Sequence, residues 1–198
     1  MDKDYLISQL GKIAKQNNVE IDAGVFELVI NRAVVRTVPR ERILQNAGEK
    51  TKTAALVLDG ICRAYYVDGE GNDITRGFSM PGTFCMEEGL FGYRESIVTW
   101  ETLEETTLLL FDMKEMKELM NRDERLKNAY IILLENALRY KIYRENGFLV
   151  ENATERYIHF KKLYPMICEK VKQQYIATYL GIAPESLSRI KKSIPPFC

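Results

Sequence analysis

Side chains that could contact DNA gather near the end of the chain, within residues 173–192. Arg189 follows Glu185 by four positions, so on a helix both lie on one face. Arginine can donate to guanine O6 and N7 together, glutamate can accept from cytosine N4, and serine can contact a phosphate or a base edge. We therefore expect a nucleic-acid interface, although a helix with a Glu185–Arg189 surface ion pair has the same pattern. The expected contact residues are Gln173, Glu185, Ser186, Ser188, Arg189 and Lys192.

Two short helices must position these side chains. The ranges 173–180 and 184–192 each have one apolar edge at helical spacing. Gly181 between them can adopt the left-handed conformation that ends a helix, and Pro184 suits a first helical position. The pattern predicts a helix-turn-helix, in which the second helix presents its N-terminal residues to the major groove.

The charge distribution favours the same interface. The chain has 28 basic and 28 acidic residues, but residues 148–198 hold eight basic and four acidic ones. A basic region behind an acidic body is typical of a nucleic-acid partner. A chance fluctuation of a few charges is the alternative.

The middle of the chain has the sequence pattern of short β-strands. Short β-like runs alternate with glycine-containing turns such as Asp59-Gly60, which predicts a small antiparallel roll of jelly-roll type. Helices are expected before it, at 5–13 and 24–31. The predicted strands are 33–38, 42–44, 54–58, 61–67, 73–78, 98–102 and 107–111.

A long helix is expected after the roll and a first helix at 113–120. Asp123 is its candidate N-cap, the helix is predicted to reach about Arg144, and Gly147 is expected to break it. The long helix carries two apolar stripes, and both must be covered. Either both pack within one chain, or one of them packs against a second copy of the chain. We assign the stripe with coiled-coil spacing to a homodimer seam, namely Leu126, Tyr130, Leu133, Ala137 and Tyr140. The neighbouring stripe is Ile131, Leu134, Leu138 and Ile142.

These elements define an α+β fold with three parts. Residues 1–112 comprise N-terminal helices and an antiparallel β-roll (a cupin-like jelly roll) acting as the sensor domain, and 113–147 are connecting and dimerisation helices. Residues 148–198 form an all-α helix-turn-helix domain, in which little or no wing is expected because few residues follow the second helix.

Several classes of chemistry are not expected. Cys62, Cys85, Cys168 and Cys198 form no CxxC pair, and His159 is the sole histidine, so we assign no metal site and no catalytic residue. A cupin-type metalloenzyme on the same roll is a third hypothesis, disfavoured because the roll lacks histidine. Structural thiols are expected rather than redox sensors. No apolar run is long enough to cross a membrane and the N-terminus lacks a signal peptide's core, so a cytoplasmic protein is expected.

The motifs resemble those of a known family. Residues 154–165 and the run Q-Q-Y-I-A-T-Y-L-G-I-A-P-E-S-L-S-R-I-K-K resemble the DNA-binding domain of the Crp/Fnr bacterial transcription regulators. Upstream, residues 55–66 and 71–84 resemble that family's cyclic-nucleotide-binding-type β-roll. The resemblance implies that Glu185 and Arg189 are the main base-contacting positions. It also implies that the long helix is the dimer helix, and that the partners are operator DNA, a second copy and RNA polymerase.

The effector is left open. In cyclic-nucleotide binders a Gly-Glu pair holds the ribose and an arginine the cyclic phosphate, whereas here Met86 precedes Glu87 and the arginine position falls at Ser96, two residues from Arg94. A buried phosphate without its guanidinium loses charge-assisted hydrogen bonds, so cyclic AMP is not expected and no cofactor is assigned. The residues expected around an effector pocket are Phe84, Met86, Glu87, Arg94, Ser96, Tyr130 and Leu134, with Leu90, Phe91, Tyr93 and Trp100 nearby; aromatic filling of the core is the alternative.

The leading hypothesis is a non-enzymatic, homodimeric DNA-binding regulator. Its roll would control the placement of two recognition helices in successive major grooves. The alternative is a ligand-binding signalling subunit whose helical tail docks a protein partner. The sequence leaves the operator, the regulated genes and the sign of regulation open.

Overall fold

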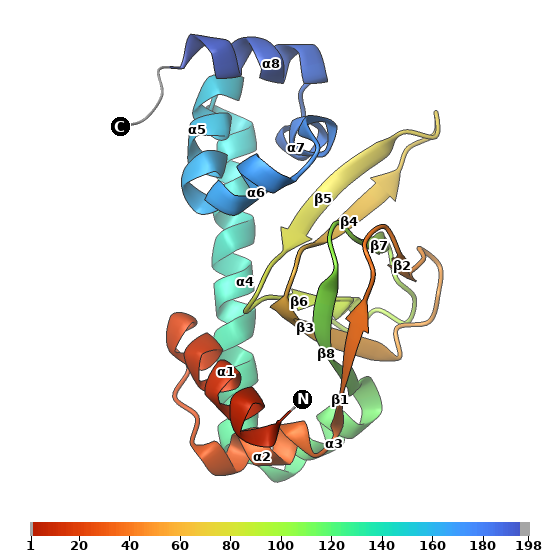
Figure 1. Cartoon of the computed structure of the whole chain (residues 1–198), viewed down its shortest axis with the longest axis vertical. Coiled ribbons are helices and arrows are strands. Elements are labelled where there is room, and N and C mark those ends of the chain that lie inside the picture. The colour runs from red at the N-terminus through yellow and green to blue at the C-terminus, as the bar shows by residue number, and fades with distance from the viewer. Residues whose placement is uncertain (1, 195–198) are drawn as a thin grey trace.

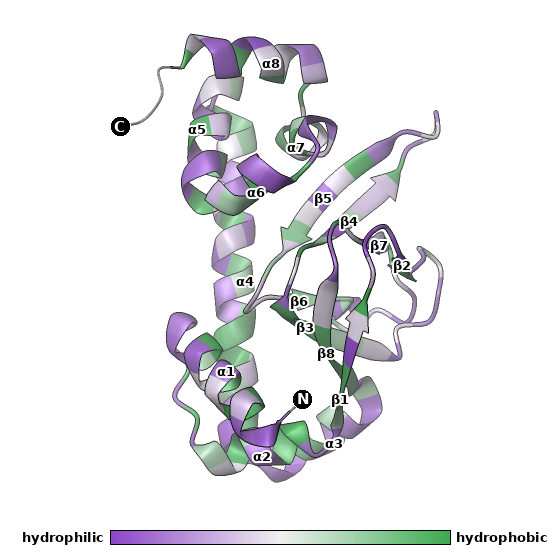
Figure 2. Ribbon diagram, viewed as in Figure 1, coloured by the Kyte–Doolittle hydropathy of each residue, from purple (hydrophilic) through white to green (hydrophobic). Residues whose placement is uncertain are grey.

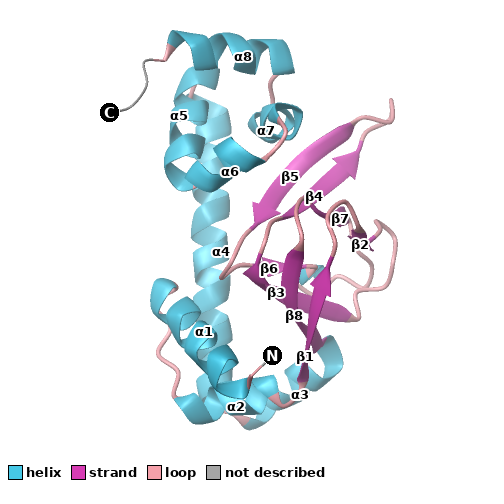
Figure 3. Ribbon diagram, in the orientation of Figure 1, coloured by secondary structure: helices cyan, strands magenta, loops and turns pink. Residues whose placement is uncertain are grey.

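The computed structural model describes residues 2–194. Two helices come first and pack against each other, α1 (Lys3–Gln16) and α2 (Ala23–Ile30). Eight strands then form the roll within this described range (Figure 3). They are β1 (Ala33–Val38), β2 (Ile43–Gln45), β3 (Thr53–Asp59), β4 (Cys62–Val67), β5 (Asp73–Ser79), β6 (Phe84–Cys85), β7 (Thr99–Thr102) and β8 (Thr106–Asp112).

The roll consists of two four-stranded antiparallel sheets, with strand orders β1-β8-β3-β6 and β2-β7-β4-β5. Alternation along each strand sends every second side chain between the sheets. Leu108 faces this interior, for example, whereas Leu109 packs under the N-terminal helices. The predicted α+β class with an antiparallel roll is confirmed. Two short elements were not predicted, β6 and a 3-10 helix, η1 (Glu87–Gly89), because two or three residues show no periodicity.

The chain after the roll is helical. Helix α4 (Glu124–Val150) runs beside the roll and joins the helices at the two ends of the molecule (Figure 1). The remaining helices are α3 (Met113–Arg122), α5 (Ala153–Leu163), α6 (Pro165–Lys170), α7 (Gln173–Leu180) and α8 (Pro184–Ser193). Among residues 2–194 no strand follows α8, and residues 195–198, with Cys198, lie outside the described part of the chain.

The start of α4 is as predicted and its end is not. The Asp123 carboxylate accepts hydrogen bonds from the backbone N–H groups of Arg125 and Leu126, which caps the helix. The predicted break at Gly147 is wrong, because the helix continues to Val150. Gly147 is buried in α4. A Cβ atom at this position would lie 3.2 Å from a carboxylate oxygen of Glu151, so the absence of a side chain permits the close approach of Glu151.

Three clusters of buried side chains hold the molecule together. One fills the roll, and a second lies between α1, α2, α4 and the outer face of the β1-β8-β3-β6 sheet. The third is the core of the C-terminal helices, and it also contains Ile61 and Phe78 of the roll. The helical domain and the roll therefore share apolar core rather than being joined by α4 alone. Figure 2 shows how the hydrophobic residues concentrate where these elements meet. No helix among the described residues is long and apolar enough to span a bilayer.

Candidate functional site

Helices α7 and α8, joined by a tight turn, lie where the sequence predicted the two helices of a helix-turn-helix. The turn is a Schellman motif, since the N–H of Ile182 donates to the carbonyl of Ala177 at 3.0 Å and that of Gly181 donates to Thr178 at 3.2 Å. Gly181 has φ +68°, in the left-handed region that favours glycine. Leu187 of α8 is fully buried against α7, so the angle between the two helices is set by apolar packing.

The opposite face of α8 is polar and open to solvent. Glu185, Arg189 and Lys192 are exposed and Ser186 and Ser188 are half-buried. The structure shows no Glu185–Arg189 ion pair; the Arg189 guanidinium instead donates to the Ser186 hydroxyl at 3.5 Å. An exposed arginine and glutamate that are not paired with each other share one helical face and are accessible to an external partner. Gln173, at the start of α7, is also exposed.

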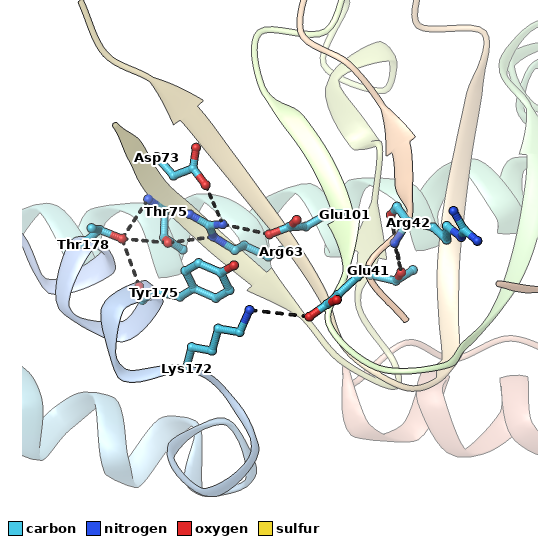
Figure 4. Close-up of polar contacts among 10 residues, drawn as sticks. Glu41, Arg42, Arg63, Asp73, Thr75, Glu101, Lys172, Tyr175 and Thr178 are labelled. Carbon is cyan, nitrogen blue, oxygen red and sulfur yellow. Dashed lines mark hydrogen bonds and ion pairs between the residues drawn. The ribbon is translucent and has the colours of Figure 1, made fainter. Parts of the chain in front are cut away.

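An arginine of the roll holds α7 in place (Figure 4). Arg63 on β4 is fully buried, and its guanidinium carbon lies 3.7 Å from the centre of the Tyr175 ring in α7. The guanidinium donates to Glu101 at 2.8 Å, to Asp73 at 3.3 Å and to the Thr75 hydroxyl at 3.0 Å. Two carboxylates thus neutralise the buried cation while an aromatic ring covers it. These contacts offset the desolvation cost of burying the guanidinium.

Hydrogen bonds extend the contact between α7 and β5. The Thr178 hydroxyl donates to the Thr75 hydroxyl at 2.8 Å and accepts from the Thr75 backbone N–H at 3.2 Å. Exposed ion pairs flank them, Lys172 with Glu41 at 3.5 Å and Lys170 with Glu104 at 3.2 Å. The exposed pairs contribute little, so the buried contacts of Arg63 and Thr178 define this interface.

Helix α4 contacts α7 as well. The hydroxyl groups of Tyr140 and Tyr179 share a short hydrogen bond, and Arg144 donates to the Tyr179 carbonyl at 3.2 Å. Arg156 donates to the Leu180 carbonyl at 3.2 Å and thereby satisfies the end of α7. Burial raises the pKa of Tyr179 far above its usual range, so this phenol stays protonated. Helix α7 is therefore held by the roll on one side and by α4 on the other.

The residues expected around an effector do not form one pocket. Phe84 packs outside the roll, with its ring centre 6.4 Å from that of Phe111, whereas Met86 points into the roll. Ser96 is buried and its hydroxyl donates to the Val98 carbonyl at 2.8 Å, while Arg94 is exposed. Strand alternation alone would place Phe84 and Met86 on one side of the sheet, but β6 ends at Cys85 and Met86 has the left-handed φ of +54°, so the two side chains lie on opposite sides.

The ribose position is occupied by an internal ion pair. Glu87 accepts from the Arg76 guanidinium at 2.9 Å, and burial raises the pKa of Glu87 although Arg76 lowers it. The neighbouring Glu88 carboxylate accepts from the Trp100 indole N–H at 3.1 Å. Met86 has φ +54°, so it takes the left-handed conformation of the glycine that the resemblance leads one to expect here.

Helix α4 covers this region through its middle. Tyr130 donates to the Leu90 carbonyl at 2.6 Å, and Leu134 beside it is half-buried. Tyr130 therefore anchors the η1 segment to α4, and it is not free for a second chain.

The stripe assigned to a dimer seam faces its own chain. Leu126 is buried and Leu133 packs in the cluster with α1 and α2, while Tyr130 and Tyr140 hydrogen-bond within the chain. Ala137, on the same face, is half-buried. These contacts within the chain occupy much of the expected seam, because heptad spacing does not reveal which face the N-terminal helices cover. Four exposed apolar residues form a stripe on another face of α4, namely Ile131, Leu138, Ile142 and Leu149.

The cysteines of the roll lie in its interior. Cys62 and Cys85 are fully buried, and a hydrogen bond with Cys62 together with burial raises the pKa of the Cys85 thiol. A protonated, buried thiol is a poor nucleophile, which favours a structural role. Residues 2–194 contain no group of three or more His, Cys, Asp or Glu side chains arranged to hold a metal ion.

Sequence reasoning missed the residues that join the two domains, namely Arg63, Thr75, Tyr175 and Thr178. One signal was present. Arg63 stands between apolar Ile61-Cys62 and Ala64 in a predicted strand, and a charge inside a buried strand requires partners. The sequence could not say that one partner comes from a helix more than 100 residues away.

The chain thus combines an antiparallel roll, a long helix along it and a set of C-terminal helices packed on the roll. Residues 35–123 match the model of the cyclic nucleotide-binding domain. Among curated protein sequences, none matches the chain significantly.

Solved structures share the fold over most of the chain. The c-di-GMP responsive global regulator CLP of Xanthomonas campestris has a TM-score of 0.72 and 19% identity, covering 86% of this chain and 90% of that one. FixK2 from Bradyrhizobium japonicum gives 0.70 and 18%, covering 81% and 83%. The Catabolite Activator Protein of Thermus thermophilus gives 0.57 and 19%, covering 87% and 83%. At such identities the likeness establishes the fold and leaves function to the site.

Proposed function

We propose that this protein is a DNA-binding transcription regulator of the Crp/Fnr type. It acts as a homodimer that places two α8 helices in successive major grooves of an operator, with RNA polymerase as a further partner. No catalytic step is assigned to it. The observation that carries the proposal is the pair α7–α8, in which a glycine turn and buried Leu187 fix a helix with an exposed polar face.

The side chains on that face support separate roles. Arg189 and Glu185 lie near the N-terminal half of α8, the part of a recognition helix that reaches base edges. Lys192 lies near its C-terminal end, where it contacts phosphate. Specificity is thus assigned to Glu185 and Arg189, and sequence-independent affinity to Lys192.

The exposed stripe of α4 supports dimerisation. Ile131 and Leu138 are seven residues apart, as are Ile142 and Leu149, and these two series are offset by four. This is the a/d spacing of a two-helix seam. Leu138 and Ile142 are each 58% exposed in the single chain, which leaves them free for the same stripe of a second copy.

The double attachment of α7 supports control by the roll. Because α7 contacts both β5 and α4, a shift of the roll against α4 moves the recognition helices relative to each other. Two recognition helices must match half-sites about one DNA turn apart, roughly 34 Å. An effector that prefers one arrangement therefore changes operator affinity by shifting the population.

A DNA titration tests the proposal. A preferred duplex is selected from a random pool, and the protein is titrated against it and a scrambled duplex at several salt concentrations. We expect Arg189→Ala to lose about 1–3 kcal/mol per half-site on the selected duplex only. Lys192→Ala should weaken binding to both duplexes and reduce the salt slope by about one.

Arg122→Ala is the matched control, because Arg122 is equally exposed but lies on α3. Selection of no duplex, or identical binding of both duplexes by Arg189→Ala and its parent, would reject α8 as a recognition helix. The outcome would then favour a signalling subunit whose helical tail docks a protein.

A further inference from the structure

A cavity opens into the roll where β1 passes into β2. Its volume is about 340 Å³, within the range of small-molecule sites. Most of the side chains that line it are apolar, although polar atoms form the larger part of its exposed surface, and Met86 and Leu108 among the lining residues are almost completely buried. The other apolar wall residues are Val38, Leu44 and Leu110. We call this space the β1–β2 cavity; it contains Met86 but none of the other residues expected around an effector.

Two arginines stand among the residues that line it. Arg36 and Arg42 are exposed, and neither guanidinium has a hydrogen-bond or ion-pair partner among residues 2–194. This contrasts with Arg63 on β4 and Arg76 on β5, which both pair with carboxylates. Two unpaired guanidinium groups beside an apolar wall attract an anion and offer it paired N–H donors.

The entrance also exposes apolar side chains. Ile43 of β2, which lines the cavity next to Arg42, is 49% exposed, and Val34, two positions before Arg36 on β1, is 66% exposed. Arg36 and Val34 share one face of β1, two positions apart, with Val38. A ligand suited to this surface has both a charged head and an apolar body.

We propose that the β1–β2 cavity binds a small amphipathic anion, with its head on Arg36 and Arg42 and its apolar tail between the two sheets. Carboxylate and phosphate heads share the required chemistry. A role for this ligand as the effector rests on the DNA-binding function proposed above.

Residues that line the cavity connect it to the helix-turn-helix. Pro39 and Arg42 line the cavity, and the loop between them is pinned to Thr102. The Thr102 hydroxyl donates to the Pro39 carbonyl at 2.7 Å. The oxygen of that hydroxyl also accepts from the backbone N–H of Arg42 at 3.0 Å. Movement of this loop is therefore transmitted to the end of β7.

Two contacts lead from there to α7 (Figure 4). Glu41, within the loop, pairs with Lys172 at the start of α7, and it has φ +58°, a strained value for a residue with a side chain. Glu101, next to Thr102, holds Arg63 under the ring of Tyr175. An anion that draws Arg42 toward the cavity thus acts on a loop that touches the DNA-binding domain.

Binding is tested with defined probes on the full chain. Octanoate, octyl phosphate and neutral octanol are added separately while thermal unfolding and methyl NMR signals are recorded. A ligand of the native state raises the melting temperature by mass action. We expect octanoate or octyl phosphate to raise it in a saturable way and to shift the Met86 methyl signal, with octanol at least tenfold weaker. The two anions distinguish a carboxylate from a phosphate head.

Arg36→Gln and Arg42→Gln should each weaken binding of the anion at least tenfold, whereas Arg122→Gln on α3 should leave it unchanged. Equal effects of octanol and octanoate, or no saturable effect of either anion, would overturn the proposed site. So would an Arg36→Gln, Arg42→Gln double variant that binds like the parent.

A separate experiment tests whether the bound anion regulates DNA binding. The affinity for the selected duplex is measured with and without the anion, in the parent and in Glu41→Gln. We expect at least a threefold change in affinity that Glu41→Gln reduces. Anion binding with no change in DNA affinity would remove the regulatory role and leave the site. Absence of DNA binding in every condition, with saturable anion binding intact, would reject the proposed function alone.

Discussion

The guanidinium of Arg63, in the β-roll, lies 3.7 Å from the centre of the Tyr175 ring, in the first helix of the helix-turn-helix. A fully buried cation is thereby shared between two domains, with Glu101 and Asp73 as its counter-ions. Removal of one partner of such a group leaves an uncompensated buried charge, which is costly. The docking of α7 is therefore a specific arrangement rather than a loose contact between neighbouring domains.

Thr178→Val tests this docking without altering shape. The change leaves the buried Thr75 N–H without an acceptor, so we expect a loss of about 1–3 kcal/mol in the free energy of unfolding. Amide hydrogen exchange should accelerate in β5 and α7. The control is Thr37→Val, which breaks an exposed hydroxyl pair with Thr107 and should change stability by less than about 0.5 kcal/mol. Equal effects of the two variants would contradict a tight interface.

Leu138→Arg and Leu133→Arg should fail in different ways. Leu138 is exposed in the single chain, so its replacement should give a folded monomer by placing unpaired charges in the dimer seam. Leu133 packs against the N-terminal helices, so its replacement should lower the melting temperature of the chain itself. Sedimentation and thermal unfolding separate the two effects. A Leu138→Arg protein that still sediments as a stable dimer would exclude this stripe as the seam.

Gly181→Ala should destabilise the helix-turn-helix. A left-handed conformation costs about 1–2 kcal/mol for a residue with a Cβ atom, and this Cβ would also lie 3.0 Å from the Phe148 ring. Gly92→Ala is the control for the backbone effect, because Gly92 has φ +89° but open space around it. Chemical denaturation should show the larger loss for Gly181→Ala. If the two losses are equal, contact with Phe148 carries no cost.

The cap of α4 gives a pH prediction. A hydrogen bond from the Arg125 side chain, together with backbone donors, lowers the pKa of Asp123 to about 2, from an ordinary 3.8. A carboxylate whose pKa falls on folding stabilises the protein above its unfolded pKa, and this contribution is lost as the pH falls through the folded value. Asp123→Asn should therefore melt below the parent at neutral pH, and the difference should shrink between about pH 4 and pH 2. A gap that stays constant over this window would show that the charge of Asp123 is irrelevant.

Local sequence signals specified the elements well. Gly181 and Pro184 mark the turn and the start of α8, and Asp123 marks the start of α4, because each acts through backbone conformation or an immediate hydrogen bond. Strand alternation and glycine turns likewise predicted the roll. The wrong prediction of a helix break at Gly147 also came from a local signal. The low helix propensity of glycine is a local quantity, and the helix continues through Gly147, which is buried in the folded chain.

Contacts between distant segments were decided by the tertiary structure. The two stripes of α4 are both apolar in sequence, and only the position of α1 and α2 determines that Leu133 is covered while Leu138 is exposed. Phe84 and Met86 are close in sequence but lie on opposite sides of a sheet. The partners of Arg63 and the opening beside Arg36 and Arg42 depend on how strands and helices meet. The sequence by itself determined the helix-turn-helix and the roll because local periodicity encodes them, whereas burial and pairing across the chain depend on packing that no local pattern records.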